Sequence, residues 1–133
     1  MKTELLAFTE QGFSLAQRLA QALDGRAQRC TPPLTLTEWT AQAFSEADAL
    51  VFVGAVGIAV RAIAPYVRSK AQDPAVVVVD ECARFAVPVL SGHLGGANDL
   101  ARRIAQICGA VPVITTATDL HRVFAVDEWA KRQ

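Results

Sequence analysis

The sequence is poor in cysteine, and its cysteines form no short motif. Its three cysteines, Cys30, Cys82 and Cys108, lie far apart without CxxC spacing. Metal sites with soft ligands usually need close cysteine pairs, so we expect no metal site in the protein. An odd, scattered set also favours reduced thiols, which predicts a cytoplasmic location.

The chain also lacks an excess of either charge. Its 13 Lys and Arg residues balance 13 Asp and Glu residues, so it has no basic stripe of the kind that binds nucleic acid. No uninterrupted apolar run approaches the ~20 residues that a membrane span needs. Residues 1–4 include an acidic side chain and lead directly into a short apolar run, which is unlike a signal peptide. We therefore expect no nucleic-acid partner and no membrane association.

The length of 133 residues and the 52% share of hydrophobic residues predict one compact domain, residues 1–133. Strand-like apolar runs alternate with segments of helical periodicity, which is typical of the α/β class. The prediction is a three-layer open sheet, mainly parallel with a local hairpin between the fourth and fifth strands, with helices on both faces. The hairpin follows from a connection too short for a parallel crossover. The predicted strands are 5–8, 27–30, 49–53, 75–79, 85–90 and 111–114, and the predicted helices are 13–23, 36–44, 58–64, 99–108 and 126–131.

Polar and glycine-rich segments follow the predicted strands. In open α/β sheets, ligands bind beyond the carboxyl ends of the strands. We therefore expect these segments to lie along a single rim of the sheet and to form one cradle for a ligand. They are residues 9–12, 54–57, 80–81, 91–98 and 115–119.

Residues 91–98, SGHLGGAN, are the strongest local signal. Gly92, Gly95 and Gly96 let backbone N–H groups turn towards a ligand, and the helix that follows presents its positive end. The segment has neither the GK[ST] ending of a P-loop nor GxGxxG spacing, so nucleotide binding has little support. Two interpretations remain. The loop binds an anion, with Ser91 and Asn98 among the contacts, or it is a tight turn that packs a helix on the sheet.

Two histidines are candidates for proton transfer, because an imidazole titrates near neutral pH. His93 lies inside the glycine-rich loop, where a catalytic role and an exposed residue without a role are equally supported. His121 lies in a less distinctive setting, and for it we favour no role.

Four side chains that form hydrogen bonds follow the last predicted strand: Thr115, Thr116, Thr118 and Asp119. Hydroxyl groups there could hold a carboxylate or a lactone carbonyl, and Asp119 could orient a base. The alternative is a hydroxyl-rich turn that caps the next element.

Arg61 is the only charged residue on an otherwise apolar predicted helix. It could recognise a carboxylate, or it could form a structural salt bridge with Asp80 or Glu81. Those two acidic residues follow a strand, where one could be a general base, although a turn-forming or ion-pairing role is favoured. We assign Lys70 and Asp73 to a solvated turn.

Several longer segments together resemble one known family, the cobalt-precorrin-5A hydrolases. The resemblance covers most of the chain from about Asp48 onward and is looser before it. It is carried by GIAVRAIAP at 57–65, DPAVVVVDE at 73–81, LSGHLGGAN at 90–98, PVITTATD at 112–119 and VDE at 126–128.

The resemblance implies a reaction in cobalamin (vitamin B12) biosynthesis. The family opens the lactone of a cobalt-corrinoid intermediate with water, and the two-carbon fragment departs as acetaldehyde. His93 is then the first candidate for proton transfer, with Glu81 or Asp119 as its carboxylate partner. The cobalt arrives within the substrate, so we expect no cofactor and no metal site. The implied substrate-binding residues are Arg61, Ser91, Gly92, Gly95, Gly96, Asn98, Thr115, Thr116 and Thr118.

One departure from the family bears on function. Family members usually continue into a carboxyl-terminal domain, whereas this sequence stops at Gln133. The sequence could be a shortened piece of a longer protein, a separate subunit could supply the domain, or the domain could act alone in binding; a homodimer also remains open. The alternatives to an enzyme are a corrinoid-binding domain that needs a partner and, with less support, a small α/β domain that binds phosphate or a nucleotide.

Overall fold

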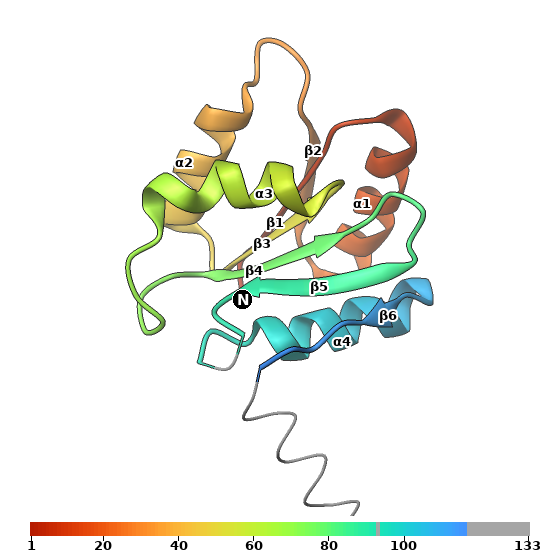
Figure 1. The fold of residues 1–133 in the computed structure, drawn as a ribbon. Helices are drawn as coiled ribbons and strands as arrows, with labels where there is room; N and C mark the ends of the chain where they lie inside the picture. Colours follow the sequence, from red (N-terminus) through yellow and green to blue (C-terminus); the bar gives the residue numbers. More distant parts are fainter. Residues whose placement is uncertain (93, 117–133) are drawn as a thin grey trace, which may run out of the picture.

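The computed structural model describes residues 1–92 and 94–116, which form one sheet with helices packed on both of its faces (Figure 1). The predicted α/β class is confirmed. Most predicted elements are present, with ends that shift by a few residues; the last strand is shorter than predicted, and the predicted helix 126–131 lies outside the described residues. In chain order the elements are β1 (Thr3–Ala7), α1 (Glu10–Leu23), β2 (Arg26–Arg29), α2 (Leu36–Glu46), β3 (Ala49–Val53), α3 (Val56–Ile63), the 3-10 helix η1 (Ala64–Tyr66), β4 (Ala75–Val79), β5 (Phe85–Leu90), α4 (Ala97–Cys108) and β6 (Val111–Pro112).

The sheet has six strands in the order β2-β1-β3-β4-β5-β6. The strands β1 to β4 are parallel, whereas β5 runs antiparallel to β4 and β6 runs parallel to β5. The predicted hairpin between the fourth and fifth strands is therefore present. It reverses the direction of the last two strands relative to the other four.

The carboxylate of Asp80 builds the turn of that hairpin. It accepts hydrogen bonds from the backbone N–H groups of Cys82, Arg84 and Phe85, at 3.0, 2.9 and 2.6 Å. Ala83 adopts a positive φ of 57°, which closes the turn within a few residues. A turn this short can only return the chain alongside the strand it has just left.

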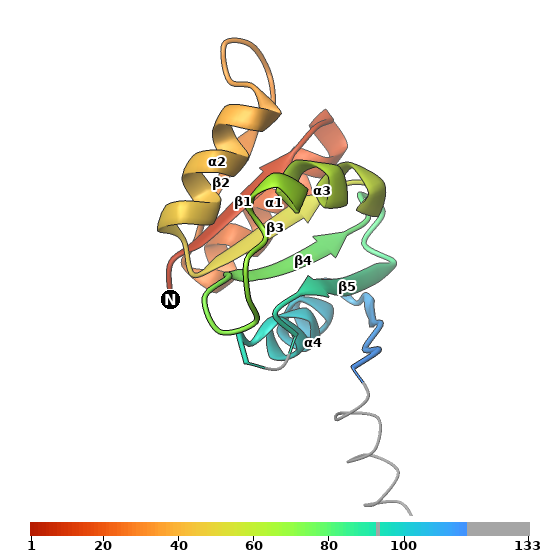
Figure 2. The same cartoon turned by 60° about the vertical axis from the view of Figure 1, so that its left-hand side comes forward.

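Each face of the sheet has its own hydrophobic core, because successive side chains of a strand point to opposite faces. On one face α1 and α4 cover side chains such as Leu5, Val51 and Val77. On the other face α2 and α3 cover side chains such as Phe52 and Val78 (Figure 2). Fully burying an apolar side chain of this size stabilises the fold by roughly 1.5–3 kcal/mol.

The helix ends follow local chemistry. Thr9 caps α1 by accepting from Gly12 N–H, and Thr35 caps α2 by accepting from Glu38 N–H, at 3.0 and 3.1 Å. Asp24, with φ 54°, takes the left-handed position after α1, although a glycine follows it directly. Position 25 needs a glycine because a larger residue would not fit: a Cβ there would lie 2.8 Å from the carbonyl oxygen of Thr3.

Within residues 1–92 and 94–116, no helix is both long and apolar enough to cross a membrane.

Candidate functional site

The reversal of β5 divides the predicted ligand-binding segments between two opposite edges of the sheet. β1, β3 and β4 end at one edge, which we call the switch-point rim (Phe8, Thr9, Gly54, Ala55, Asp80 and Glu81). In the hairpin, Val79 at the end of β4 pairs with Ala86, whereas Leu90 at the end of β5 pairs with Val76 near the start of β4. The segment after β5 therefore lies at the other edge, and the prediction of a single rim is wrong.

We call this second edge the glycine-loop rim; its described residues are 68–73, 91–92, 94–98 and 116. Here the structure brings together two segments that are separate in the sequence. Asn98 Nδ2 donates to Thr116 Oγ1 at 3.1 Å, and a Cβ at Gly92 would lie 3.0 Å from the same oxygen. A cavity of about 290 Å³ adjoins them; its lining residues are Lys70, Val89, Leu90, Ser91, Gly92, Leu94 and Thr116. The sequence prediction that these two segments meet is therefore confirmed.

The glycines of the loop are needed because the loop folds tightly on itself. A Cβ at Gly95 would lie 2.4 Å from Ser91 Cβ, and Gly96 has a φ of +84°. The first backbone N–H groups of α4, from Ala97 and Asn98, donate to the carbonyl oxygens of Ser91 and Gly92 at 3.1 and 2.9 Å. These two donors are therefore already engaged within the loop.

The connection between η1 and β4 forms the other wall of this rim; it is the exposed turn predicted for Lys70, whereas the prediction is wrong for Asp73, which is buried. The Asp73 side chain is 7% exposed, and its two carboxylate oxygens accept from Arg68 N–H at 3.1 and 2.8 Å. Ser91 Oγ donates to the carbonyl oxygen of Asp73 at 3.1 Å, which joins this connection to the glycine loop. Lys70 is exposed and contributes to the cavity wall.

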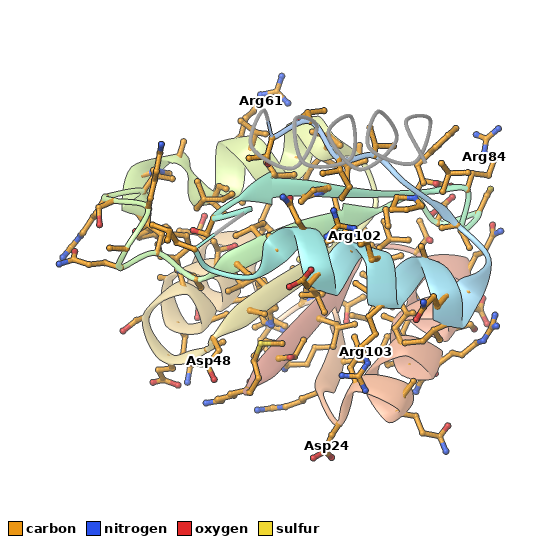
Figure 3. All side chains as sticks on the ribbon, turned by 90° about the horizontal axis from the view of Figure 1, so that it is seen from below. Asp24, Asp48, Arg61, Arg84, Arg102 and Arg103 are labelled. Carbon is orange, nitrogen blue, oxygen red and sulfur yellow. The ribbon has the colours of Figure 1, made fainter. Side chains whose placement is uncertain are left out.

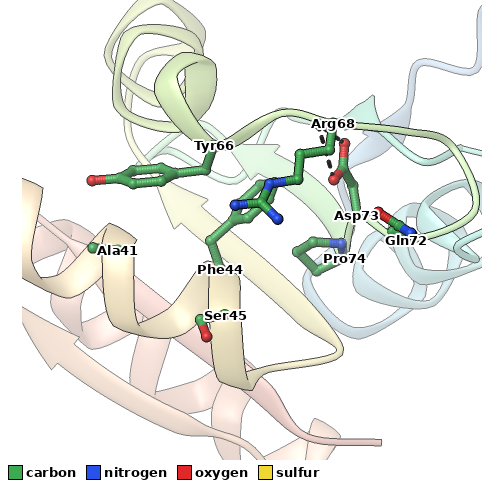
Figure 4. A pocket seen from close by; sticks show the side chains of 8 residues that line it. All are labelled: Ala41, Phe44, Ser45, Tyr66, Arg68, Gln72, Asp73 and Pro74. Atoms are coloured by element: carbon green, nitrogen blue, oxygen red, sulfur yellow. Dashed lines mark hydrogen bonds between the residues drawn. The ribbon is translucent and has the colours of Figure 1, made fainter.

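A second cavity of about 270 Å³ lies on the α2 side of the same connection (Figure 4). The rings of Phe44 and Tyr66, with centroids 5.9 Å apart, line it together with the exposed Arg68. Figure 4 shows the Arg68 side chain extending over this cavity, while its backbone N–H turns towards Asp73. The two cavities therefore share the segment that carries Arg68 and Lys70.

The switch-point rim has a different character. Thr9 Oγ1 donates to Glu81 Oε2 at 2.6 Å and so joins the start of α1 to the end of β4. Asp80 is used by the hairpin turn, which is the turn-forming role favoured for this pair of acids. A largely apolar cavity of about 390 Å³ lies beside them; its lining residues are Phe8, Thr9, Val53, Gly54, Ala55, Ile58, Asp80 and Glu81. Glu81 thus lies at the edge opposite the glycine loop and is not brought together with it.

Arg61 is exposed on α3, and Figure 3 shows it projecting from the surface of the protein. Among the described residues no acidic side chain lies within ion-pair distance of its guanidinium, so the predicted salt bridge with Asp80 or Glu81 is absent there. Recognition of a carboxylate by Arg61 stays a prediction.

The remaining predicted site residues divide by position. Thr115 is exposed after β6. The candidates His93, Thr118 and Asp119 lie outside the described residues, so their roles stay predictions. Within the part of the chain that the structure describes, no three His, Cys, Asp or Glu side chains are grouped to hold a metal ion.

We compared the sequence and the fold with those of known proteins. Residues 38–119 match the family model described as cobalamin synthesis G N-terminal. A cobalt-precorrin-5A hydrolase from Salmonella typhimurium is 44% identical over 138 residues, which cover 95% of this chain and 38% of that protein. The chain belongs to the cobalamin synthesis G N-terminal family.

Two further relatives agree with this assignment. A cobalt-precorrin-5A hydrolase from Priestia megaterium is 45% identical over 89 residues, 67% of this chain and 24% of that protein. A crystal structure from Sulfolobus solfataricus, described as a homologue of cobalamin biosynthesis protein G, has a TM-score of 0.71 and 29% identity and covers 86% of this chain and 36% of that one. The chain therefore spans about two fifths or less of the length of these relatives.

Within this family domain, sequence reasoning missed Lys70 and Asp73. Their spacing within KAQDP resembles an ordinary polar turn. The available signal was the Asp-Pro pair directly before an entirely buried strand, since a side chain so close to buried backbone is often used to satisfy backbone N–H groups.

Proposed function

We propose that this chain is the α/β part of a cobalt-precorrin-5A hydrolase in cobalamin biosynthesis, and that its glycine-loop rim binds the cobalt-corrinoid substrate. The observation that carries this proposal is the meeting of Ser91, Gly92, Thr116 and Lys70 around one cavity. Two hydroxyl groups and Lys70 can bind the carboxylates and the lactone carbonyl of the substrate, because charged acceptors form the stronger hydrogen bonds, and the three apolar side chains of the same cavity can pack against its macrocycle. The names of the relatives support the same reaction.

The proposed reaction consumes one water molecule at the lactone. Water adds to the acyl carbon, the acyl–oxygen bond breaks, and a carboxylate and a hydroxyl group result. Removal of the hydroxyl proton then allows the adjacent carbon–carbon bond to break, so that the two-carbon fragment leaves as acetaldehyde and the electron pair passes into the macrocycle. The cobalt is part of the substrate, and we propose no metal or cofactor held by the protein itself.

We assign proton transfer to His93, which belongs to the glycine loop in sequence. Of the two carboxylates that the sequence offers as its partner, Glu81 lies at the switch-point rim. This leaves Asp119 as the proposed partner. Ser91 and Thr116 both line the cavity, so we propose that their hydroxyl groups bind the substrate there.

The relatives are much longer than this chain, which covers 38% and 36% of two of them. This favours a second candidate function, in which the chain binds the corrinoid and a further domain or subunit is needed for turnover. Binding of phosphate or a nucleotide has less support, because two N–H groups at the start of α4 are already engaged. We also infer a reducing compartment such as the cytoplasm, since Cys30, Cys82 and Cys108 are all free thiols.

The deciding experiment incubates the chain with cobalt-precorrin-5A and measures acetaldehyde, alone and together with the remaining part of the Salmonella relative expressed separately. Acetaldehyde from the chain alone supports a complete enzyme. Acetaldehyde only from the mixture, with substrate bound by this chain, supports the second candidate. If the chain neither binds the substrate nor increases acetaldehyde release in the mixture, the proposed function is wrong.

A further inference from the structure

The segment of residues 67–74, which we call the cationic connection, lies between the two cavities of the glycine-loop rim. Lys70 lines the cavity shared with Ser91 and Thr116, and Arg68 lines the cavity shared with Phe44 and Tyr66. We propose that this connection is a carboxylate-recognition element, in which Lys70 and Arg68 bind acidic side chains on the edge of a tetrapyrrole ligand. The inference rests on the proposed function, and it names the groups that select the substrate class at that site.

The connection is held in place before any ligand arrives. Asp73 fixes the backbone of Arg68 through both carboxylate oxygens, and the Asp73 N–H donates to the Ser69 carbonyl oxygen at 3.0 Å. Gln72 N–H donates to Ser69 Oγ at 3.2 Å. A recognition element that is already ordered loses less conformational entropy when it binds its ligand.

The connection is also fixed relative to the rest of the rim. Ser91 Oγ donates to the carbonyl oxygen of Asp73, and the Pro74 that follows leads directly into buried β4. Lys70 and the glycine loop therefore form two walls of the same cavity and share one position relative to the sheet. A carboxylate held by Lys70 would thus orient the rest of the ligand towards Ser91, Gly92 and Thr116.

The positive charges of the connection are available to a ligand. Among residues 1–92 and 94–116, no acidic side chain lies within ion-pair distance of the Arg68 guanidinium or the Lys70 ammonium. The one acid in the connection, Asp73, is buried and directs both carboxylate oxygens to a backbone N–H group. Both cationic side chains are exposed at the rim.

The cavity at the switch-point rim differs from the glycine-loop cavity in the charge of its lining. The described cavity there is lined by Asp80 and Glu81 and by no basic side chain. Like charges repel, so a ligand with many carboxylates is disfavoured at the switch-point rim and favoured at the glycine-loop rim. The exposed Arg84 lies beside Asp80 at the switch-point rim but does not line its cavity, so the difference in charge is one between the two cavity linings.

The experiment measures the binding of uroporphyrin, a fluorescent tetrapyrrole rich in carboxylates, to the wild-type chain and to matched variants. Lys70→Gln is expected to weaken binding about tenfold, as for the loss of one charge-assisted hydrogen bond. Arg68→Gln is expected to weaken it by about threefold to tenfold, and Lys70→Arg to retain most of the affinity because the charge remains. Coproporphyrin, which has fewer carboxylates, should bind more weakly to the wild type and respond less to Lys70→Gln.

Arg84→Gln is the matched control, because Arg84 is an exposed cation at the hairpin of the other rim (Figure 3). It should leave uroporphyrin binding within about twofold, since exposed charges separated by more than a Debye length are largely screened. Melting temperatures of all variants show whether any loss of binding comes from unfolding.

Each outcome bears on the inference separately from the proposed function. Equal binding by wild type and by folded Lys70→Gln and Arg68→Gln would overturn the inference, even if the acetaldehyde assay succeeds. A failure of the wild-type chain to bind uroporphyrin at all would also overturn it. Loss of acetaldehyde release with uroporphyrin binding intact would count against the proposed reaction and leave carboxylate recognition standing.

Discussion

The two rims of this sheet each carry a partly apolar cavity, and the charged side chains in the two cavity linings have opposite sign. At the switch-point rim, β1, β3 and β4 end at an apolar cavity with a Thr9–Glu81 hydrogen bond and a hairpin built on Asp80. At the glycine-loop rim, β5 ends at a cavity lined by two hydroxyl groups and Lys70 together with three apolar side chains. The difference teaches that the direction of a single strand decides which polar segments can act together.

The comparison also separates two ways of using an acidic side chain. Asp73 and Asp80 both accept hydrogen bonds from backbone N–H groups. Asp73 thereby orders the connection before β4, and Asp80 orders the turn after it. Glu81 accepts from a side-chain hydroxyl group and faces a cavity. An acid that follows or precedes a strand is therefore weak evidence for catalysis until its hydrogen-bond partners are known.

The largest expected effect tests the proton transfer assigned to His93. His93→Ala should lower the rate of acetaldehyde release by about 100-fold or more in the complete enzyme, as for removal of a general acid–base group. His121→Ala is the matched control, because it removes the chain's other histidine from a segment with no assigned role. Equal rates for wild type and His93→Ala would remove His93 from the mechanism.

The next largest effect tests the closure of the glycine loop. Gly95→Ala places a methyl group 2.4 Å from Ser91 Cβ, so the loop must move, and we expect a loss of about 1–3 kcal/mol in the free energy of unfolding. Gly57→Ala is the control, since its Cβ meets only the flexible end of Arg61 at 3.5 Å within α3. Urea denaturation should show the control to be unchanged or slightly more stable. If the Gly95→Ala chain is as stable as wild type, the loop adopts another conformation without loss of stability, and the prediction is wrong.

A similar or somewhat smaller effect tests whether the cationic connection depends on its buried acid. Asp73→Ala leaves the Arg68 N–H without its acceptor, and we expect a loss of about 1–2 kcal/mol in the free energy of unfolding. Asp99→Ala, at a side chain that is 90% exposed, should change stability by less than about 0.5 kcal/mol. If Asp73→Ala keeps both wild-type stability and wild-type uroporphyrin affinity, the connection needs no such support.

The smallest expected effect is at the other rim. Glu81→Gln keeps an oxygen that can accept from Thr9 Oγ1, so stability should change by less than about 1 kcal/mol. Because Glu81 lies opposite the glycine loop, acetaldehyde release should stay within about threefold of the wild-type rate. A steady-state assay that instead shows a loss comparable to that of His93→Ala would mean that both rims serve one reaction, and the comparison would fail.

Much of the fold could be predicted because its signals are local. The run 75–79 is apolar throughout and becomes the fully buried β4, and the helix predicted at 36–44 is present as α2. The short link after β4 also predicted the hairpin with β5. The site was harder to predict, because the same hairpin moves the glycine loop to the far edge, and that consequence depends on pairing between strands.

Burial was the second part that local patterns missed. Lys70 and Asp73 differ little from other polar turn residues in sequence, yet one lines a cavity and the other is nine-tenths buried. A side chain's exposure depends on which distant segment packs over it, here the segment around Ser91.

The sequence by itself determined the family and the succession of strands and helices along the chain, because apolar periodicity, turn residues and long motifs are properties of neighbouring residues. Only the tertiary structure decided that the predicted cradle is two separate rims, that Glu81 and the glycine loop are apart, and that Lys70 and Arg68 line cavities of the glycine-loop rim. The physical reason is that strand direction and burial arise from hydrogen bonds and packing between residues far apart in the chain.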